Sequence, residues 1–223
     1  MTSQDTTSQQ LREQMVRTQL ESRQITDRRV LDAFREIPRE RFIPSASARE
    51  AYADAPVPIG FGQTISQPYI VALMLQELRV KPEHRVLDVG MGSGYQTALL
   101  AKLAGHVYAI ERIPELTERS VDVLASLNLD NVTAITGDGS LGWPEEAPFD
   151  RIVCGAGGPE VPDPWLEQLA EGGRLVMPVG SLHAQTLIAC DKRDGEIERH
   201  DLCGVRFVRL IGKEGWTDRP TRG

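Results

Sequence analysis

A glycine-rich loop between an apolar strand pattern and an apolar helix pattern is the first feature of the chain that could bind a ligand. It reads Asp88-Val89-Gly90-Met91-Gly92-Ser93-Gly94. Glycines here let the backbone approach a ligand closely, and the following helix adds free N–H groups and partial positive charge. In parallel α/β sheets, ligands bind at the carboxyl ends of the strands. We therefore predict that Gly90, Gly92 and Gly94 bind a cofactor.

Acidic residues stand at the ends of three consecutive predicted strands. They are Asp88 beside the glycine loop, Glu111, and Asp138 within Gly137-Asp138-Gly139. Asp88 suits a ligand with an ammonium group, and Glu111 suits a ribose diol. Together the three carboxylates fit an adenosine that carries an amino-acid arm, which is S-adenosylmethionine. Any one of them could instead cap a helix, but all three in order favour the cofactor.

The spacing of the glycines separates two kinds of cofactor. A dinucleotide site has the pattern G-x-G-x-x-G, in which the glycines serve a pyrophosphate. This chain has G-x-G-x-G, one residue tighter, with an acidic residue beside the loop. The carboxylate of Asp88 would oppose a pyrophosphate, so an NAD-dependent oxidoreductase stays only as an alternative.

The elements that position these residues alternate between strand and helix. This alternation predicts a doubly wound α/β fold with a mostly parallel, Rossmann-like sheet and helices on both faces. Two strand-like segments near the C-terminus, 185–191 and 204–211, have no helix between them and predict an antiparallel addition at the sheet edge. Strands are predicted at 85–89, 106–111, 132–136, 149–154 and 174–178, and helices at 66–78, 93–103, 114–127 and 165–170.

The N-terminal part of the chain lies outside this alternation. Residues 1–8 have no apolar period and are expected to be a disordered leader. Apolar spacing predicts helices at 11–20 and 26–37, the second with Thr26 as its N-cap, and 39–63 is predicted to be a long structured loop. We expect one domain over residues 1–223: residues 1–66 form a helical appendage and substrate-side loop, 67–180 the cofactor-binding core, and 181–223 the antiparallel strands and tail.

Composition narrows the class of protein. The 223 residues include 25 basic and 32 acidic side chains, a formal net charge of −7. This balance argues against binding of nucleic acid, because phosphate binding depends on Lys and Arg. No apolar run is long enough to span a membrane, and the three cysteines form no Cys-x-x-Cys pair. We expect a cytoplasmic monomer with reduced thiols, and the scattered histidines predict no metal site.

Several further segments resemble the protein-L-isoaspartate O-methyltransferase family. The most specific is Gly62-Gln63-Thr64-Ile65-Ser66-Gln67-Pro68-Tyr69-Ile70, which precedes the first core strand. Two departures from the family pattern are Arg209, where many members have proline, and the glycine-rich segment 155–159. Segments 138–139, 145–150, 172–180, 204–208 and 214–216 match as well, so that the resemblance covers roughly residues 11–216.

The resemblance implies the repair of aged proteins. The family methylates the free α-carboxylate of an L-isoaspartyl residue with S-adenosylmethionine, and the ester collapses to a succinimide whose hydrolysis restores some aspartate. Isoaspartyl proteins and peptides would then be the partners of this chain. The family's active-site serine corresponds to Ser66. The matching cofactor positions are Gln63, Thr64, Ile65, Gly90, Glu111, Arg112, Asp138 and Gly139, and the matching substrate positions are Val205, Arg206, Phe207 and Val208.

A serine suits this acceptor chemically. A carboxylate is ionised at neutral pH, because its unperturbed pKa is about 4, so that no general base is needed. We expect Ser66, as the N-cap of its helix, to orient one carboxylate oxygen through its hydroxyl. It does not lie in G-x-S-x-G, which argues against a nucleophilic serine. The alternatives are a carboxyl methyltransferase acting on an aspartate of a biosynthetic peptide, the NAD-dependent oxidoreductase, and a catalytically silent binding module.

Overall fold

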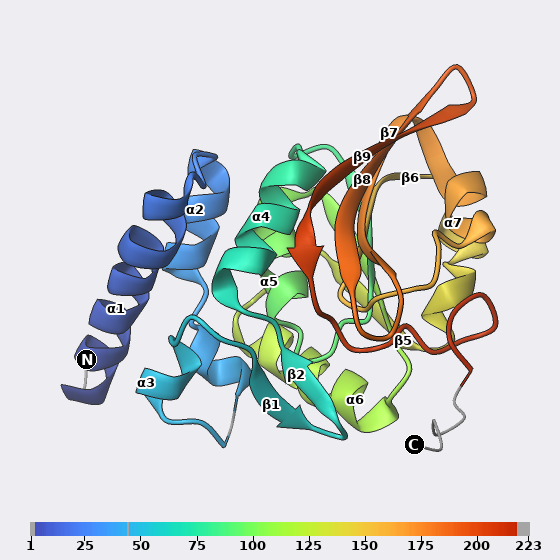
Figure 1. Ribbon diagram of the computed structural model, residues 1–223. Coiled ribbons are helices and arrows are strands. Elements are labelled where there is room, and N and C mark those ends of the chain that lie inside the picture. The colour runs from blue at the N-terminus through green and yellow to red at the C-terminus, as the bar shows by residue number, and fades with distance from the viewer. Residues whose placement is uncertain (1–2, 44, 218–223) are drawn as a thin grey trace.

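The computed structural model describes residues 3–43 and 45–217, and its centre is a seven-stranded sheet (Figure 1). The strands are β3 (Arg85–Val89), β4 (His106–Glu111), β5 (Val132–Thr136), β6 (Phe149–Cys154), β7 (Leu169–Gly180), β8 (Gln185–Arg193) and β9 (Glu196–Val205). They lie in the order β5-β4-β3-β6-β7-β8-β9. The first five pair in parallel, whereas β8 and β9 are antiparallel additions. The predicted fold class is confirmed.

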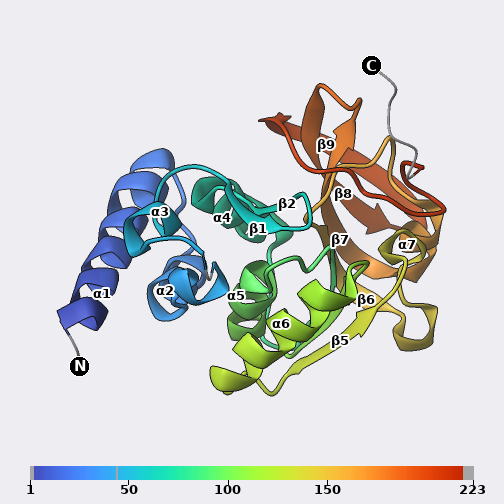
Figure 2. The same ribbon diagram turned by 90° about the horizontal axis from the view of Figure 1, so that it is seen from below.

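Helices cover both faces of the sheet (Figure 2). On one face lie α4 (Pro68–Leu78), α5 (Tyr95–Leu103) and α6 (Pro114–Ser126), and on the other lies α7 (Asp163–Gln168). Near α7 come the 3-10 turns η4 (Gly139–Leu141) and η5 (Pro144–Glu146). Alternation along each strand divides the core, because neighbouring residues of a strand point to opposite faces. Val86 thus packs with the α4–α5 side, and Leu87 packs with the α7 side.

The N-terminal helices form an outer layer. Figure 1 shows α1 (Ser3–Met15) and α2 (Arg28–Glu36) beyond α4 and α5, on the side away from the sheet. The π-helical turn η1 (Val16–Leu20) and the 3-10 turn η2 (Glu21–Arg23) join them. The ring of Phe34, which is fully buried, makes an edge contact with Tyr95 of α5, with 5.9 Å between the ring centroids. This packing attaches the appendage to the helix that follows the glycine loop.

The predicted loop at 39–63 contains short regular elements. They are the 3-10 turn η3 (Arg39–Phe42), α3 (Ala48–Ala51), β1 (Val57–Gly60) and the start of β2 (Gln63–Ile65). Strands β1 and β2 form a separate antiparallel hairpin. This hairpin delivers the chain to Ser66 and to the start of α4.

Three predicted boundaries in the N-terminal part are wrong. The leader is not disordered from residue 3 onward, because α1 begins at Ser3 and its polar turns extend a helix that is anchored by buried residues further along. The N-cap of α2 is Asp27 rather than Thr26, and its carboxylate accepts the backbone N–H groups of the first turn. The N-cap of α4 is Gln67, so Ser66 lies one residue before the cap.

The last strand also differs from the prediction. It runs over 196–205 rather than 204–211, because Asp194 and Gly195 adopt positive φ angles of 53° and 78° and form a tight hairpin. Such two-residue turns match the twist of antiparallel strands, so pairing resumes at once. After Val205 the chain leaves the sheet, and residues 206–211 make only isolated bridges, including one between Arg209 and Gly157. Across residues 3–43 and 45–217, no helix is both long and apolar enough to cross a membrane.

Candidate active site

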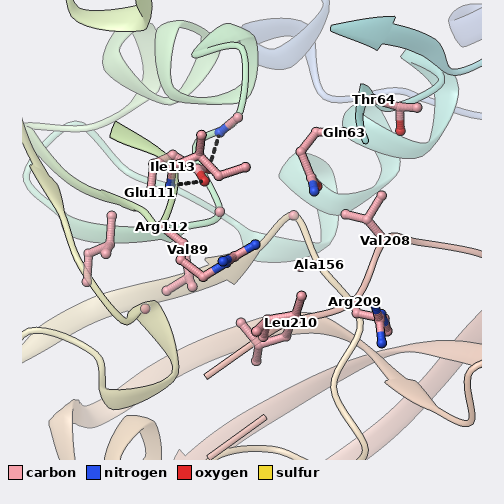
Figure 3. Close-up of a pocket in the computed structure, with 16 residues that line it drawn as sticks. Gln63, Thr64, Val89, Glu111, Arg112, Ile113, Ala156, Val208, Arg209 and Leu210 are labelled. Atoms are coloured by element: carbon pink, nitrogen blue, oxygen red, sulfur yellow. Dashed lines mark hydrogen bonds between the residues drawn. The ribbon is translucent and has the colours of Figure 1, made fainter. Parts of the chain in front are cut away.

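A cavity lies at the carboxyl ends of β3, β4 and β6 (Figure 3). We call it the glycine-loop cavity. Figure 3 shows Gln63 and Thr64 of β2 facing Glu111 and Arg112 across it, with the C-terminal segment 208–210 along another side. The structure thus brings together seven of the predicted cofactor residues: Gln63, Thr64, Gly90, Gly92, Glu111, Arg112 and Gly139.

Glu111 is the acidic residue that lines this cavity. Its Oε2 accepts the backbone N–H of Gly92 at 2.8 Å, and its Oε1 accepts that of Ile113 at 3.0 Å. The side chain is buried, and the two bonds fix both oxygens in place. A carboxylate oxygen can accept two hydrogen bonds, so each keeps one acceptor site for a ligand hydroxyl. This arrangement fits a ribose diol.

The remaining wall of the cavity suits the other parts of an adenosyl ligand. Gly90 and Gly92 present backbone, and the apolar side chains of Ile110, Ile113 and Leu210 can cover a flat base. The residues present therefore fit S-adenosylmethionine, with Glu111 holding the ribose.

Asp88, although predicted to bind the cofactor, lies outside the lining of the cavity. It is completely buried, and its carboxylate accepts hydrogen bonds from Gln96 Nε2 at 2.8 Å and Thr97 Oγ1 at 2.7 Å. Burial raises the pKa of Asp88 to about 6, against the opposing effect of these bonds. Its side chain points to the α5 face, because it has the same parity along β3 as Val86. Asp88 therefore holds α5 to the sheet.

Asp138 and Gly94 also lie outside the described lining of the cavity. The carboxylate of Asp138 accepts the N–H of Ser140 at 3.0 Å and that of Lys213 at 2.8 Å, which ties the C-terminal tail to the turn after β5. Gly94 is the N-cap of α5 and packs against Ser120 of α6. Of the three predicted acids, Glu111 is thus the one in the described lining of the cavity, and contact of Asp88 and Asp138 with the cofactor stays a prediction.

A second cavity adjoins the first on the side of β9, and we call it the Ser66 cavity. Its volume is about 300 Å³. Thr64 and Gly155 line both cavities, so the two are continuous. The structure brings Ser66 together with the four predicted substrate residues, Val205, Arg206, Phe207 and Val208.

Ser66 is half-buried and faces two directions. It lines the Ser66 cavity, and it also lines a small hollow with Ile65 and the glycine-loop residues Gly90 and Gly92. Its hydroxyl makes no hydrogen bond to any residue within 3–43 and 45–217. A free hydroxyl at this junction can donate to an acceptor oxygen.

The sequence analysis did not predict that Leu210 and Ile211 belong to the cavity wall, and it named Arg209 only as a departure from the family pattern. All three line the glycine-loop cavity. The loop after β6 holds this segment, since the N–H of Gly157 donates to Val208 O at 2.7 Å and the N–H of Leu210 donates to Gly157 O at 2.9 Å. The indole of Trp216 donates to the same carbonyl at 3.1 Å. The glycine-rich 155–159 segment was the signal for this close approach.

The sheet topology and the ribose-type carboxylate define a Rossmann-like methyltransferase. The model of the family described as protein-L-isoaspartate(D-aspartate) O-methyltransferase matches residues 9–215, and the chain belongs to this family. A protein-L-isoaspartate O-methyltransferase of Methanoculleus marisnigri is 50% identical over 187 residues, 84% of this chain and 85% of the relative. One of Anaeromyxobacter dehalogenans is 54% identical over 184 residues, 81% and 88% of the two chains.

Solved structures agree with this assignment. A protein-L-isoaspartate O-methyltransferase superimposes with a TM-score of 0.84 at 30% identity, over 92% of this chain and 67% of that one. A Plasmodium falciparum structure described as the same methyltransferase, in complex with S-adenosyl-L-homocysteine, has a TM-score of 0.79 at 31% identity, over 90% and 98% of the chains. Both likenesses cover at least 90% of this chain.

Proposed function

We propose that this enzyme transfers the methyl group of S-adenosylmethionine to the free α-carboxylate of L-isoaspartyl residues in aged proteins and peptides. The observation that carries the proposal is the position of Ser66, at the junction between the glycine-loop cavity and the Ser66 cavity. Family membership supports both the methyl donor and the acceptor.

Each wall has a distinct task in this proposal. S-adenosylmethionine supplies an electrophilic methyl group on a sulfonium. Glu111 and the backbone of Gly90 and Gly92 bind the nucleoside, and Gln63 and Thr64 close the opposite side. Ser66 donates its hydroxyl hydrogen to one oxygen of the acceptor carboxylate and so orients the other. The carboxylate is already ionised at neutral pH, so no side chain has to remove a proton.

The edge beside Ser66 would bind the peptide backbone. Strand β9 is the last strand of the sheet, and its last two residues together with residues 206–208 line the Ser66 cavity. An extended peptide can bind along such an edge through main-chain hydrogen bonds, which tolerate many side chains. This tolerance suits a substrate that is defined by one altered backbone link.

The test is a pair of peptides that are identical except for isoaspartate or aspartate at one position. With labelled S-adenosylmethionine, we expect methylation of the isoaspartyl peptide alone. Equal methylation of both would overturn the proposal and favour a carboxyl methyltransferase for ordinary aspartate. Methylation of neither peptide, with the donor bound, would overturn it as well.

A substitution tests the role of Ser66. Ser66→Ala should lower kcat about tenfold or more, because one hydrogen bond to a charged acceptor is lost, while S-adenosylhomocysteine binds with unchanged affinity. The matched control is Ser22→Ala, since Ser22 lies on the exposed N-terminal helical layer and its hydroxyl donates to Thr18 O. Wild-type kcat in Ser66→Ala would remove the serine from the mechanism.

We also propose that residues 1–223 act as one domain, as a cytoplasmic monomer that needs neither metal nor nucleic acid. The free thiols of Cys154, Cys190 and Cys203 support a reducing compartment. Light scattering of the purified protein should give the mass of one chain, and cell fractionation should place the activity in the soluble fraction. A stable dimer or a membrane-bound activity would contradict this.

A further inference from the structure

A groove continues from the Ser66 cavity past the tip of the β1–β2 hairpin. Its walls are Gly62 and Gln63 of the hairpin, Leu182 and His183 of the turn between β7 and β8, and segment 206–211 apart from Leu210. Its volume is about 630 Å³. Arg206, Phe207 and Val208 line both the groove and the Ser66 cavity, so the two form one continuous surface. We call it the basic groove.

The ionisable side chains of the groove all carry nitrogen. They are Arg206, Arg209 and His183, and no carboxylate lines the groove within the part of the chain that the structure describes. This contrasts with the protein as a whole, which has 32 acidic side chains and a net charge of −7. A local positive field in an acidic protein marks a surface that attracts negative groups.

The two arginines also lack the ion pairs that other arginines of this chain make. Arg35 contacts three carboxylates, and Arg174 contacts two. Neither Arg206 nor Arg209 pairs with an acidic residue within 3–43 and 45–217. Arg206 is also exposed to solvent, and its side chain makes no hydrogen bond to a residue within 3–43 and 45–217. The groove therefore presents two guanidinium groups to whatever binds in it.

We propose that the basic groove selects acidic residues that flank the isoaspartyl site of the substrate. The inference rests on the proposed function, because it extends the peptide that occupies the Ser66 cavity into the neighbouring groove. An extended peptide advances about 3.3 Å per residue and exposes alternate side chains, so that a carboxylate a few residues from the isoaspartate can reach Arg206 or Arg209. A guanidinium group can bind a carboxylate through two parallel N–H donors, whereas the ammonium group of a lysine cannot bind it in this paired way.

The experiment compares four isoaspartyl peptides that differ only in their flanks. One is neutral, one has two aspartates on the N-terminal side, one has them on the C-terminal side, and one has two lysines. We expect one of the acidic peptides to have kcat/KM about two- to tenfold above the neutral peptide, through a lower KM, and the lysine peptide to fall below it. The favoured side then gives the direction in which the peptide runs.

Substitutions and a change of salt concentration distinguish selection by Arg206 and Arg209 from a general effect of the protein's charge. Arg206→Gln and Arg209→Gln should each reduce the ratio of kcat/KM between acidic and neutral peptides, and together they should bring it to about 1. Arg28→Gln, an exposed arginine of α2 with the same change of charge, should keep the wild-type ratio. Raising the salt concentration from about 0.05 M to about 0.5 M should shrink the wild-type ratio, because exposed pairs are screened.

Two outcomes would overturn the inference while leaving the proposed function intact. One is equal kcat/KM for neutral and acidic isoaspartyl peptides in the wild type. The other is an acidic preference that survives in the double variant. A failure to methylate even the neutral isoaspartyl peptide would instead overturn the proposed function, and this inference with it.

Discussion

The guanidinium group of Arg39 donates a hydrogen bond of 2.8 Å from Nη2 to the backbone carbonyl oxygen of Ser66. Arg39 has no solvent exposure, and its Nε donates to Ala51 O at 2.7 Å. Its guanidinium carbon lies 4.9 Å from the ring centroid of Tyr95. Burial lowers the pKa of Arg39 to about 10, so the group stays charged at neutral pH. The buried guanidinium group thus fixes the backbone of Ser66, the residue that we propose orients the acceptor carboxylate.

We predict that Arg39→Met lowers both stability and turnover. The buried carbonyl of Ala51 and the partly buried carbonyl of Ser66 lose their donor, which costs roughly 1–3 kcal/mol each, partly offset because no charge is buried any longer. Because Ser66 loses its anchor, kcat should fall about tenfold, and Arg39→Lys should recover part of it. Urea unfolding and steady-state kinetics with an isoaspartyl peptide measure the two effects.

The control for Arg39 is Arg29→Met. Arg29 also donates to two backbone carbonyls, those of Val80 and Leu103, but it lies on α2, away from the cavities. It should lose stability without a comparable fall in kcat for the protein that remains folded. If both variants lose kcat in proportion to stability, Arg39 has only a structural role.

Glu111→Gln tests the carboxylate at the cavity wall. An amide has one acceptor oxygen, so one of the N–H groups of Gly92 and Ile113 would face an NH₂ group, and one ribose contact would also be lost. We expect affinity for S-adenosylhomocysteine to fall about ten- to a hundredfold, which calorimetry measures. Glu115→Gln, an exposed acid in the first turn of α6, should bind normally. Unchanged affinity in Glu111→Gln would separate this carboxylate from the ribose.

The site residues that could be predicted from the sequence lie mostly at the ends of regular strands. Glu111 ends a strand of clear apolar pattern, and a residue at the carboxyl end of a parallel strand faces the ligand edge in this fold. Segment 62–70 was assigned to the site because its residues resemble the family motif, and not because of a periodic apolar pattern. Asp88 shows the limit of the argument. It is the last residue but one of β3, and the alternation that buries Val86 on the α5 side directs Asp88 there too.

The site residues that could not be predicted from the sequence lie in irregular segments. Residues 206–211 are apolar enough to suggest a strand, but they make only single bridges, one from Arg209 to Gly157 in the loop after β6 and one from Ile211 to Trp216. Their position depends on contacts between residues about 50 apart in the chain, such as those of Gly157 with Val208 and Leu210, and no local period encodes these contacts. For the same reason the basic groove became visible only in three dimensions.

Gly94→Ala tests whether this glycine packs or binds. An added Cβ would lie 2.9 Å from the Cβ of Ser120, and the residue has a φ of +83°. We expect a loss of about 2–3 kcal/mol in the free energy of unfolding. Gly172→Ala has a similar φ of +73° with no atom within 4 Å of the added Cβ, so it should lose only about 1 kcal/mol. A loss of cofactor affinity in Gly94→Ala without a loss of stability would instead support the predicted role of Gly94 in cofactor binding.

Asp88→Asn should change the pH dependence of stability. The pKa of Asp88 is about 6 in the folded protein and about 3.8 unperturbed, so between these values the folded state holds a proton that the unfolded chain has released. The stability from this group is complete below pH about 4 and is lost as the pH rises through 6. The free energy of unfolding of Asp88→Asn, measured relative to the wild type, should therefore rise by up to roughly 3 kcal/mol between pH 4 and pH 7. A pKa shift of one unit corresponds to about 1.4 kcal/mol. Urea unfolding over this range measures the difference, with the exposed Asp122→Asn as the control for net charge. A difference that stays flat with pH, or that favours the wild type as the pH rises, would mean that Asp88 is ionised in the folded protein throughout.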